Sequence, residues 1–253
     1  MATDWITPDW RAPANVRALS TTRNSGVSRG PYASFNLGMH VGDDPRAVAE
    51  NRLQLRAELN LPREPHWLAQ AHGASVLALE DRVGNQVADA PRNSPTADGA
   101  ITRVPGLACV ILTADCLPVL LCDRAGTIVA AAHGGWRGLA AGILENTLAA
   151  MHVPPAEVLA WLGPAIGPEA YEVGDEVHAA LTKGHSEADQ AFEPRAAGKW
   201  WCDLYLIASQ RLRRMGVTHV YGGGFCTYSE RERFFSYRRD GECGRMATLI
   251  WLS

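Results

Sequence analysis

The sequence lacks the features of a secreted, membrane or nucleic-acid-binding protein. Its longest apolar runs fall well short of the roughly 20 residues that a membrane-spanning helix needs. The first residues, MATDWITPDWRAP, contain neither the basic region nor the apolar region of a signal peptide. A formal net charge of −3 provides no basic surface for non-specific nucleic-acid binding. We therefore expect no membrane and no nucleic acid as partners.

Paired cysteines, internal repeats and low-complexity segments are also missing. The six cysteines include no Cys-x-x-Cys pair, which argues against a zinc ribbon or a thioredoxin-type site. Without a secretory signal, they indicate reduced thiols in a cytoplasmic protein. The predicted organisation is a single domain over residues 1–253, and the oligomeric state is left open.

Three short apolar runs form the centre of the sequence. LACVIL (107–112), VLLC (119–122) and TIVAAA (127–132) are too short and too closely bounded by Gly and Pro to be buried helices. They are apolar on both faces, as strands are in a sheet that is covered on both sides. Further strands are predicted early in 17–42, at 66–72, 75–80 and 158–163, and around 218–222, 233–238 and 245–252.

Helices are predicted between these strands. They cover 45–60, 138–151, 173–184 and 203–215, and the first has Val48, Leu53, Leu55 and Leu59 as its apolar side. The polar segment 85–99 is predicted to be a surface loop. Because strands and helices are mixed without strict alternation, we expect an α/β or α+β fold, with mixed β-sheets flanked by helices.

His72, Cys116 and His133 each lie where an apolar strand gives way to a Gly-containing turn. One thiolate and two imidazoles form a ligand set suited to zinc, and three protein ligands leave a fourth position for water or substrate. The alternative is that Cys116 is a small buried apolar residue and that both histidines are hydrogen-bonded polar groups. Spacing alone does not decide between the two.

Copper is the other metal that this ligand set suits. Cu²⁺ outcompetes zinc at most sites with nitrogen and sulfur ligands. A multicopper oxidase, however, needs several centres built mostly from histidine, and this chain has eight His and no His-x-His pair. We therefore expect copper binding in vitro only.

Two segments could contact an anion. HGGWRG (133–138) leads into a predicted helix, and its free N–H groups and Arg137 could cradle a phosphate, although a tight turn and a solvated arginine explain it equally well. Near the C-terminus, five arginines including Arg245 alternate with aromatic residues including Tyr237. Such a mixture could stack a nucleobase and neutralise phosphate, or simply place aromatics inside a strand and arginines outside.

Four motifs together resemble a known family. TADCLPVL, AAHGGWRGL, GPAIGPEAYEVG and FFSYRRDGECGRMA are similar to the bacterial laccase-domain or "multicopper polyphenol oxidase" family, to which mammalian FAMIN is also similar. The resemblance extends from about Arg17 to Leu252. It implies metal ligands in a Gln-x-His-Gly turn, in TADC and in AAHGGWRG, which are again His72, Cys116 and His133.

The resemblance also implies an activity. Its relatives imply a zinc-dependent purine nucleoside phosphorylase for adenosine, inosine, guanosine and methylthioadenosine, with adenosine deaminase activity; purine nucleosides and inorganic phosphate are then the expected partners. Arg52, in the family's Asn-Arg pair, and Arg137 become candidate phosphate ligands, although Arg52 could be an ordinary solvated helix residue. Asp115 could be the general acid/base or only cap a turn, and Asn36 is a candidate for ribose or base contact.

Three other functions stay open at this point. Cys116 near His133 also resembles the thiolate–imidazole pair of a metal-independent cysteine hydrolase. The family resemblance further implies a peptidoglycan-editing role, which a non-catalytic factor could perform through a partner. A copper polyphenol oxidase comes last, for the reason of histidine number given above.

Overall fold

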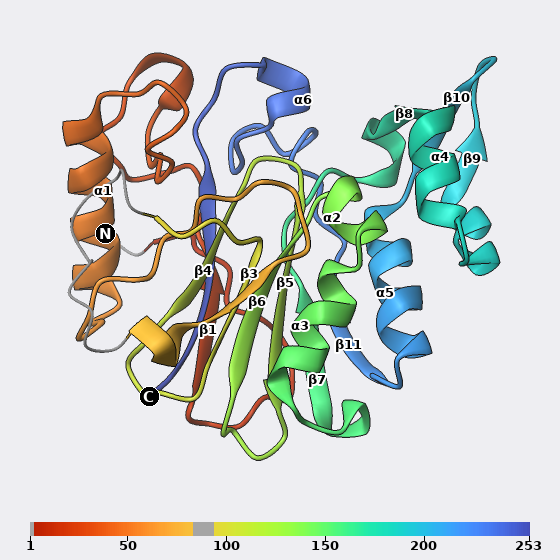
Figure 1. Ribbon diagram of the computed structural model, residues 1–253. Helices are drawn as coiled ribbons and strands as arrows, with labels where there is room; N and C mark the ends of the chain where they lie inside the picture. The colour runs from red at the N-terminus through yellow and green to blue at the C-terminus, as the bar shows by residue number, and fades with distance from the viewer. Residues whose placement is uncertain (1–2, 83–93) are drawn as a thin grey trace.

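The middle of the chain forms a mixed six-stranded sheet in the order β11-β7-β5-β6-β3-β2. The computed structural model describes residues 3–82 and 94–253 (Figure 1). The pairs β7–β11 and β2–β3 are parallel and the other pairs are antiparallel. The strands are β2 (Val76–Ala78), β3 (Gly99–Thr102), β5 (Leu117–Asp123), β6 (Val129–Gly134), β7 (Val158–Leu162) and β11 (His219–Gly222).

A second, antiparallel sheet packs on one face of the first. It contains β1 (Val16–Ser20), β12 (Met246–Leu252) and β4 (Cys109–Thr113). Leu120 of β5 shares a buried cluster with Ile111 of β4 and Ile250 of β12, whereas Val119 and Leu121 belong to a cluster with the helices. The runs in β5 and β6 are thus buried on both faces because each face of the six-stranded sheet is covered. The run at 107–112, in β4, is buried between that sheet and the cluster that contains Leu55.

Helices cover the outside of the two sheets, as Figure 1 shows. α2 (Trp136–Ala140), α3 (Ile143–Met151) and α5 (Leu204–Arg214) pack on the six-stranded sheet, and α1 (Pro45–Glu58) packs its Leu55 on the three-stranded sheet. α4 (Asp175–Thr182) lies with a small third sheet, β8 (Glu172–Gly174), β9 (Phe192–Pro194) and β10 (Lys199–Cys202), and α6 (Tyr237–Asp240) precedes β12. This mixed α/β fold confirms the predicted fold class.

Membrane-spanning helices are not among these elements. Within residues 3–82 and 94–253, every helix is too short or too polar to cross a bilayer.

Some local predictions were wrong. Residues 66–72 make only isolated bridges, at His66 and Ala69, and form no strand. The helix predicted over 138–151 is two helices, because Gly142 has a φ of +88° and a right-handed helix cannot continue through that conformation. In place of a strand at 233–238 the chain turns into α6.

Two further differences concern helix α1 and the predicted loop. Leu53 was assigned to the apolar side of α1, but it is 63% exposed, and the buried positions are Val48, Asn51 and Leu55. Of the surface loop predicted at 85–99, residues 85–93 lie outside the described part of the chain, and Gly99 begins β3.

Candidate metal centre

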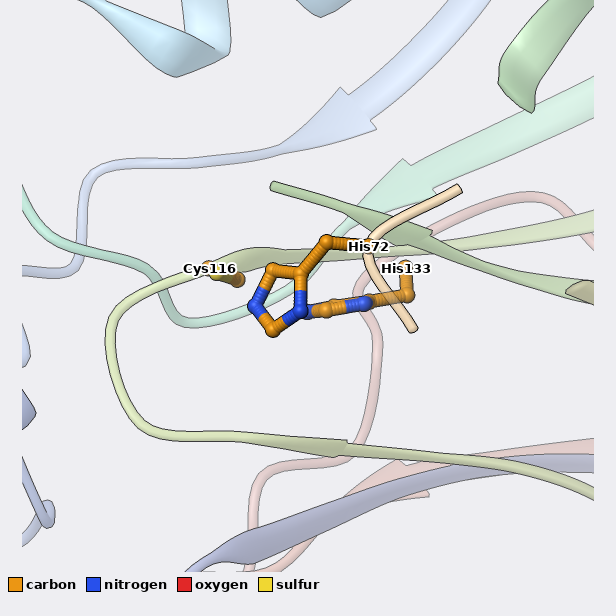
Figure 2. Close-up of side chains that lie close together, drawn as sticks. All are labelled: His72, Cys116 and His133. Carbon is orange, nitrogen blue, oxygen red and sulfur yellow. The ribbon is translucent and has the colours of Figure 1, made fainter. Parts of the chain in front are cut away.

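Strand register brings Cys116 and His133 together. β5 and β6 are antiparallel, with Pro118 opposite His133, so the residue just before β5 lies beside the end of β6. His72 approaches from a separate turn. The ligand atoms of His72, Cys116 and His133 all lie within 4.8 Å of one another. Figure 2 shows these three side chains close together. His133 is buried, Cys116 is half-buried and His72 is exposed, so the group is open to solvent on the His72 side.

The Asp98 carboxylate makes hydrogen bonds with His133 and with the turn that carries His72. The sequence analysis did not identify this residue. It lies just before β3 and is fully buried. Its Oδ1 is 2.9 Å from Nδ1 of His133 and accepts the N–H of His72 at 2.9 Å; Oδ2 accepts the N–H groups of Ala71 at 3.1 Å and Gly73 at 2.7 Å. A carboxylate on one ring nitrogen directs the other toward a metal, so His133 offers Nε2.

The turn at residues 71–73 depends on the same carboxylate. His72 has a φ of +59°, in the left-handed region that non-glycine residues seldom adopt. Three successive N–H groups of this turn point at Asp98, and this concave arrangement of donors is a favourable environment for an anion. Asp98 therefore stabilises the uncommon backbone conformation that presents His72.

Gly135 leaves space for the side chains of Cys116 and His72. A Cβ atom there would lie 3.0 Å from Sγ of Cys116 and 3.3 Å from Cδ2 of His72. Arg137, two residues further on, is exposed and stacks over Trp136, with its guanidinium carbon 4.3 Å from the ring centroid. The glycines of HGGWRG thus serve close packing around the ligands, and the phosphate contact of Arg137 stays a prediction.

The side chains of the group carry complementary charges. Burial opposes ionisation of Cys116, but the charge of His133 and hydrogen bonds from both histidines lower the pKa of the thiol to about 6. Burial likewise disfavours charged His133, but the Cys116 thiolate and Asp98 raise its pKa to about 9. Because a metal binds the thiolate form of cysteine, the geometry and the ionisation of this group both fit a metal ion.

Asp115 joins the Cys116 turn to two distant segments. Its Oδ1 accepts a 2.6 Å hydrogen bond from Oγ1 of Thr227, and its Oδ2 accepts one of 2.6 Å from the N–H of Arg238. Its carbonyl accepts the N–H of Ile166 at 2.9 Å, and its φ is +99°. These contacts correspond to the turn-capping role; the acid/base role stays a prediction.

Asn36 and Arg52 lie on the α1 side of the fold. The Asn36 amide is fully buried: its oxygen accepts the N–H groups of Gly38 and Arg245, and its nitrogen donates to Asp43. A ribose or base contact by Asn36 stays a prediction. Arg52 is not the ordinary solvated residue that the alternative described, because it is half-buried and its Nε and Nη2 donate to the carbonyl of Leu37.

The chain is similar to known proteins along almost its whole length. The family model described as multi-copper polyphenol oxidoreductase laccase matches residues 17–253. The chain is 53% identical over 249 residues to a protein of Pseudomonas aeruginosa named as a purine nucleoside phosphorylase. It is 51% identical over 247 residues to the purine nucleoside phosphorylase YfiH of Escherichia coli. Each alignment covers 98% of both chains.

Solved structures show the same fold. A crystal structure of a Neisseria meningitidis protein, 52% identical, superposes with a TM-score of 0.93 and covers 99% of both chains. The crystal structure of YlmD from Geobacillus stearothermophilus, 34% identical, has a TM-score of 0.89 and covers 94% of this chain and 92% of that one.

Proposed function

We propose that this chain, which belongs to the multi-copper polyphenol oxidoreductase laccase family, is a zinc-dependent purine nucleoside phosphorylase that also deaminates adenosine. The observation that carries the proposal is the open group of His72, Cys116 and His133, in a chain about half identical to proteins named as purine nucleoside phosphorylases. Adenosine, inosine, guanosine and methylthioadenosine are the proposed nucleosides.

The donor set favours zinc in this proposal. One thiolate and two imidazoles suit a tetrahedral zinc ion with one position open, and a bound zinc ion would act as a Lewis acid and lower the pKa of a bound water. Copper remains a competitor in vitro, since Cu²⁺ binds most nitrogen and sulfur sites more tightly. The one His₂Cys group found among the described residues does not suffice for a multicopper oxidase.

Phosphorolysis makes defined demands on the residues around the centre. A phosphate oxygen bonds to C1′ of the ribose while the C1′–N9 bond breaks; its electron pair leaves with the base, which takes up a proton. Because the ribose becomes cationic, a correctly positioned phosphate stabilises the transition state. We assign phosphate binding to Arg52 and Arg137 and nucleoside contact to Asn36 as proposals. In deamination, water adds to C6 of adenosine and ammonia leaves, giving inosine.

A cysteine hydrolase is the second candidate, and one observation favours it. Asp98, His133 and Cys116 form a carboxylate–imidazole–thiol series in which the pKa of the thiol is lowered to about 6, as nucleophilic catalysis requires. Such an enzyme has no use for His72 beside the same sulfur. A peptidoglycan-editing role and a cytoplasmic location stay proposals; the six unpaired cysteines support the second.

Metal analysis combined with an activity assay separates the two candidates. Protein purified without added metal is analysed by mass spectrometry, and base release from adenosine is followed with and without phosphate, for wild type and for Cys116→Ala. We expect about one zinc per chain and phosphate-dependent adenine release, both lost in the variant. Metal-free wild type without base release, but with hydrolysis of amides, would instead establish the hydrolase.

A further inference from the structure

A cavity of about 550 Å³ lies beside α6 and is separate from the metal centre. Its walls come from the loop at 23–31, from the segment at 231–232, and from the end of α6 with the turn that follows it. The ligand group of His72, Cys116 and His133 does not contribute to this lining. The volume is in the range of small-molecule sites and is larger than a single inorganic ion would fill.

Hydrogen bonds hold the walls of this cavity in place. Nδ2 of Asn24 donates to the carbonyl of Glu232 at 3.0 Å. Further along the same loop, the hydroxyl of Tyr32 donates to Oε1 of Glu242. The loop at 23–32 is therefore joined to the C-terminal segment at two points, so the cavity exists before any ligand binds.

Arg23 presents a fixed guanidinium to the cavity. Its Nε and Nη2 donate to the carbonyl of Ala33, at 2.9 and 2.7 Å, and its Nη1 donates to the carbonyl of Arg231 at 3.2 Å. Its central carbon lies 4.7 Å from the centroid of the Phe235 ring. Because a guanidinium has five N–H donors, two of them have no partner among the residues that the structure describes. A guanidinium fixed in this way loses little side-chain entropy when it binds a carboxylate.

Unpaired charges of both signs line the cavity. Within residues 3–82 and 94–253, four charged lining residues form no salt bridge: Arg23, Arg231, Glu232 and Glu242. The fifth, Asp240, is already neutralised, since Nε and Nη2 of Arg239 donate to its two oxygens at 2.9 and 2.7 Å. Burial lowers the pKa of Arg23, and the charges of nearby carboxylates only partly offset this effect. The unpaired charges of the lining, two positive and two negative, therefore sum to zero.

A zwitterion suits this lining better than a simple ion does. A plain anion such as phosphate would meet the two arginines but also the carboxylates of Glu232 and Glu242. A plain cation would meet these carboxylates but also both guanidiniums. A ligand with one carboxylate and one ammonium group has a partner for each sign of charge. Amino acids, and short peptides with free ends, carry these two groups.

We propose that this cavity binds a free amino acid or a short peptide, with the carboxylate on Arg23 and Arg231 and the ammonium group on Glu232 and Glu242. The proposal is independent of the proposed phosphorylase function, because the cavity shares no residue with the metal centre. A single amino acid and a short peptide offer the same two groups, so the test includes both.

A titration followed by ligand-observed NMR, with the dipeptide Ala-Ala and with alanine, is the first measurement. Wild type is compared with Arg231→Gln and Glu232→Gln, because both side chains are exposed and neither makes a hydrogen bond in the described part of the chain. Arg213→Gln and Glu50→Gln are matched controls, exposed residues of α5 and α1 outside the cavity. We expect about a 10-fold or larger loss of affinity in each cavity variant, the size of one charge-assisted hydrogen bond, and wild-type affinity in both controls.

Blocked ligands then assign the two charges. Amidation of the Ala-Ala carboxylate should weaken binding to wild type and make Arg231→Gln neutral, and N-acetylation should do the same for Glu232→Gln. Tighter binding of Ala-Ala than of alanine would identify a peptide as the ligand, and the reverse order would identify an amino acid; both support the site. The absence of saturable binding of either ligand to wild type would overturn the proposal. Equal losses in the control variants, or acetate bound as tightly as alanine, would also overturn it.

Discussion

Replacing Asp98 by Asn is the sharpest test of how the metal centre is built. The substitution keeps the size of the side chain but turns one acceptor oxygen into a donor. Oδ1 is shared by His133 and the N–H of His72, and Oδ2 accepts two further backbone N–H groups, so either orientation of the amide sets its NH₂ group against donors. If the NH₂ group instead donates to Nδ1 of His133, the ring proton moves to Nε2, the atom that should bind the metal.

The expected loss of zinc affinity is about 10- to 100-fold, the usual effect of removing a carboxylate behind a metal-binding histidine, or about 1.4 to 2.7 kcal/mol. Competition against a chromogenic zinc chelator measures it. Asp123→Asn is a matched control, since Asp123 is also buried and accepts backbone N–H groups, from Thr127 and Ile128, but lies at the opposite end of β5. Zinc affinity of folded Asp98→Asn within twofold of wild type, or an equal loss in Asp123→Asn, would refute the reasoning.

Three further predictions concern single positions. Gly135→Ala should lower zinc affinity while the fold is retained, because the added methyl would crowd Cys116; unchanged zinc stoichiometry and affinity in the chelator assay would count against this. In metal-free protein, alkylation of Cys116 by iodoacetamide should be fast above pH 6 and slow below it, because the thiol has a pKa of about 6 and only the thiolate reacts. Peptide mass mapping measures this reaction, and a midpoint near pH 9 would contradict the pairing of Cys116 with His133. Asp115→Ala should lower the free energy of unfolding, measured in urea, by about 2–4 kcal/mol, because the hydroxyl of Thr227 and the backbone N–H of Arg238 lose their acceptor. A change below about 1 kcal/mol would exclude the turn-capping role of Asp115.

Strand positions were accessible from the sequence because their signal is local. The runs at 119–122 and 127–132 are apolar on both faces and bounded by polar turns, which is how a strand covered on both sides looks in any context. The same reasoning failed at 233–238. Phe234 and Phe235 are both fully buried, as in a strand covered on both sides, but the chain forms no strand there and turns into α6.

The ligands were recognisable, whereas their support was not. His72, Cys116 and His133 were candidates from their expected places at strand ends, and the family resemblance implied the same three residues. The structure brings them together, although no strand precedes His72. Asp98 lies in a polar stretch expected to be a loop, and its function depends on backbone N–H groups 25 to 27 residues away, which no side-chain pattern records. The position of Arg52 was equally hidden, because its stacking on Trp67 is a tertiary contact.

The pairing of β5 with β6 gives the metal centre a dependence on folding order. His72 and the Cys116–His133 pair belong to different segments, and Asp98 connects them only once β3 has joined β6. A slip of one residue between β5 and β6 would turn His133 to the other face of the sheet, away from Cys116. Uptake of the proposed metal ion would therefore depend on the completed sheet, and a bound ion would oppose the separation of these three strands.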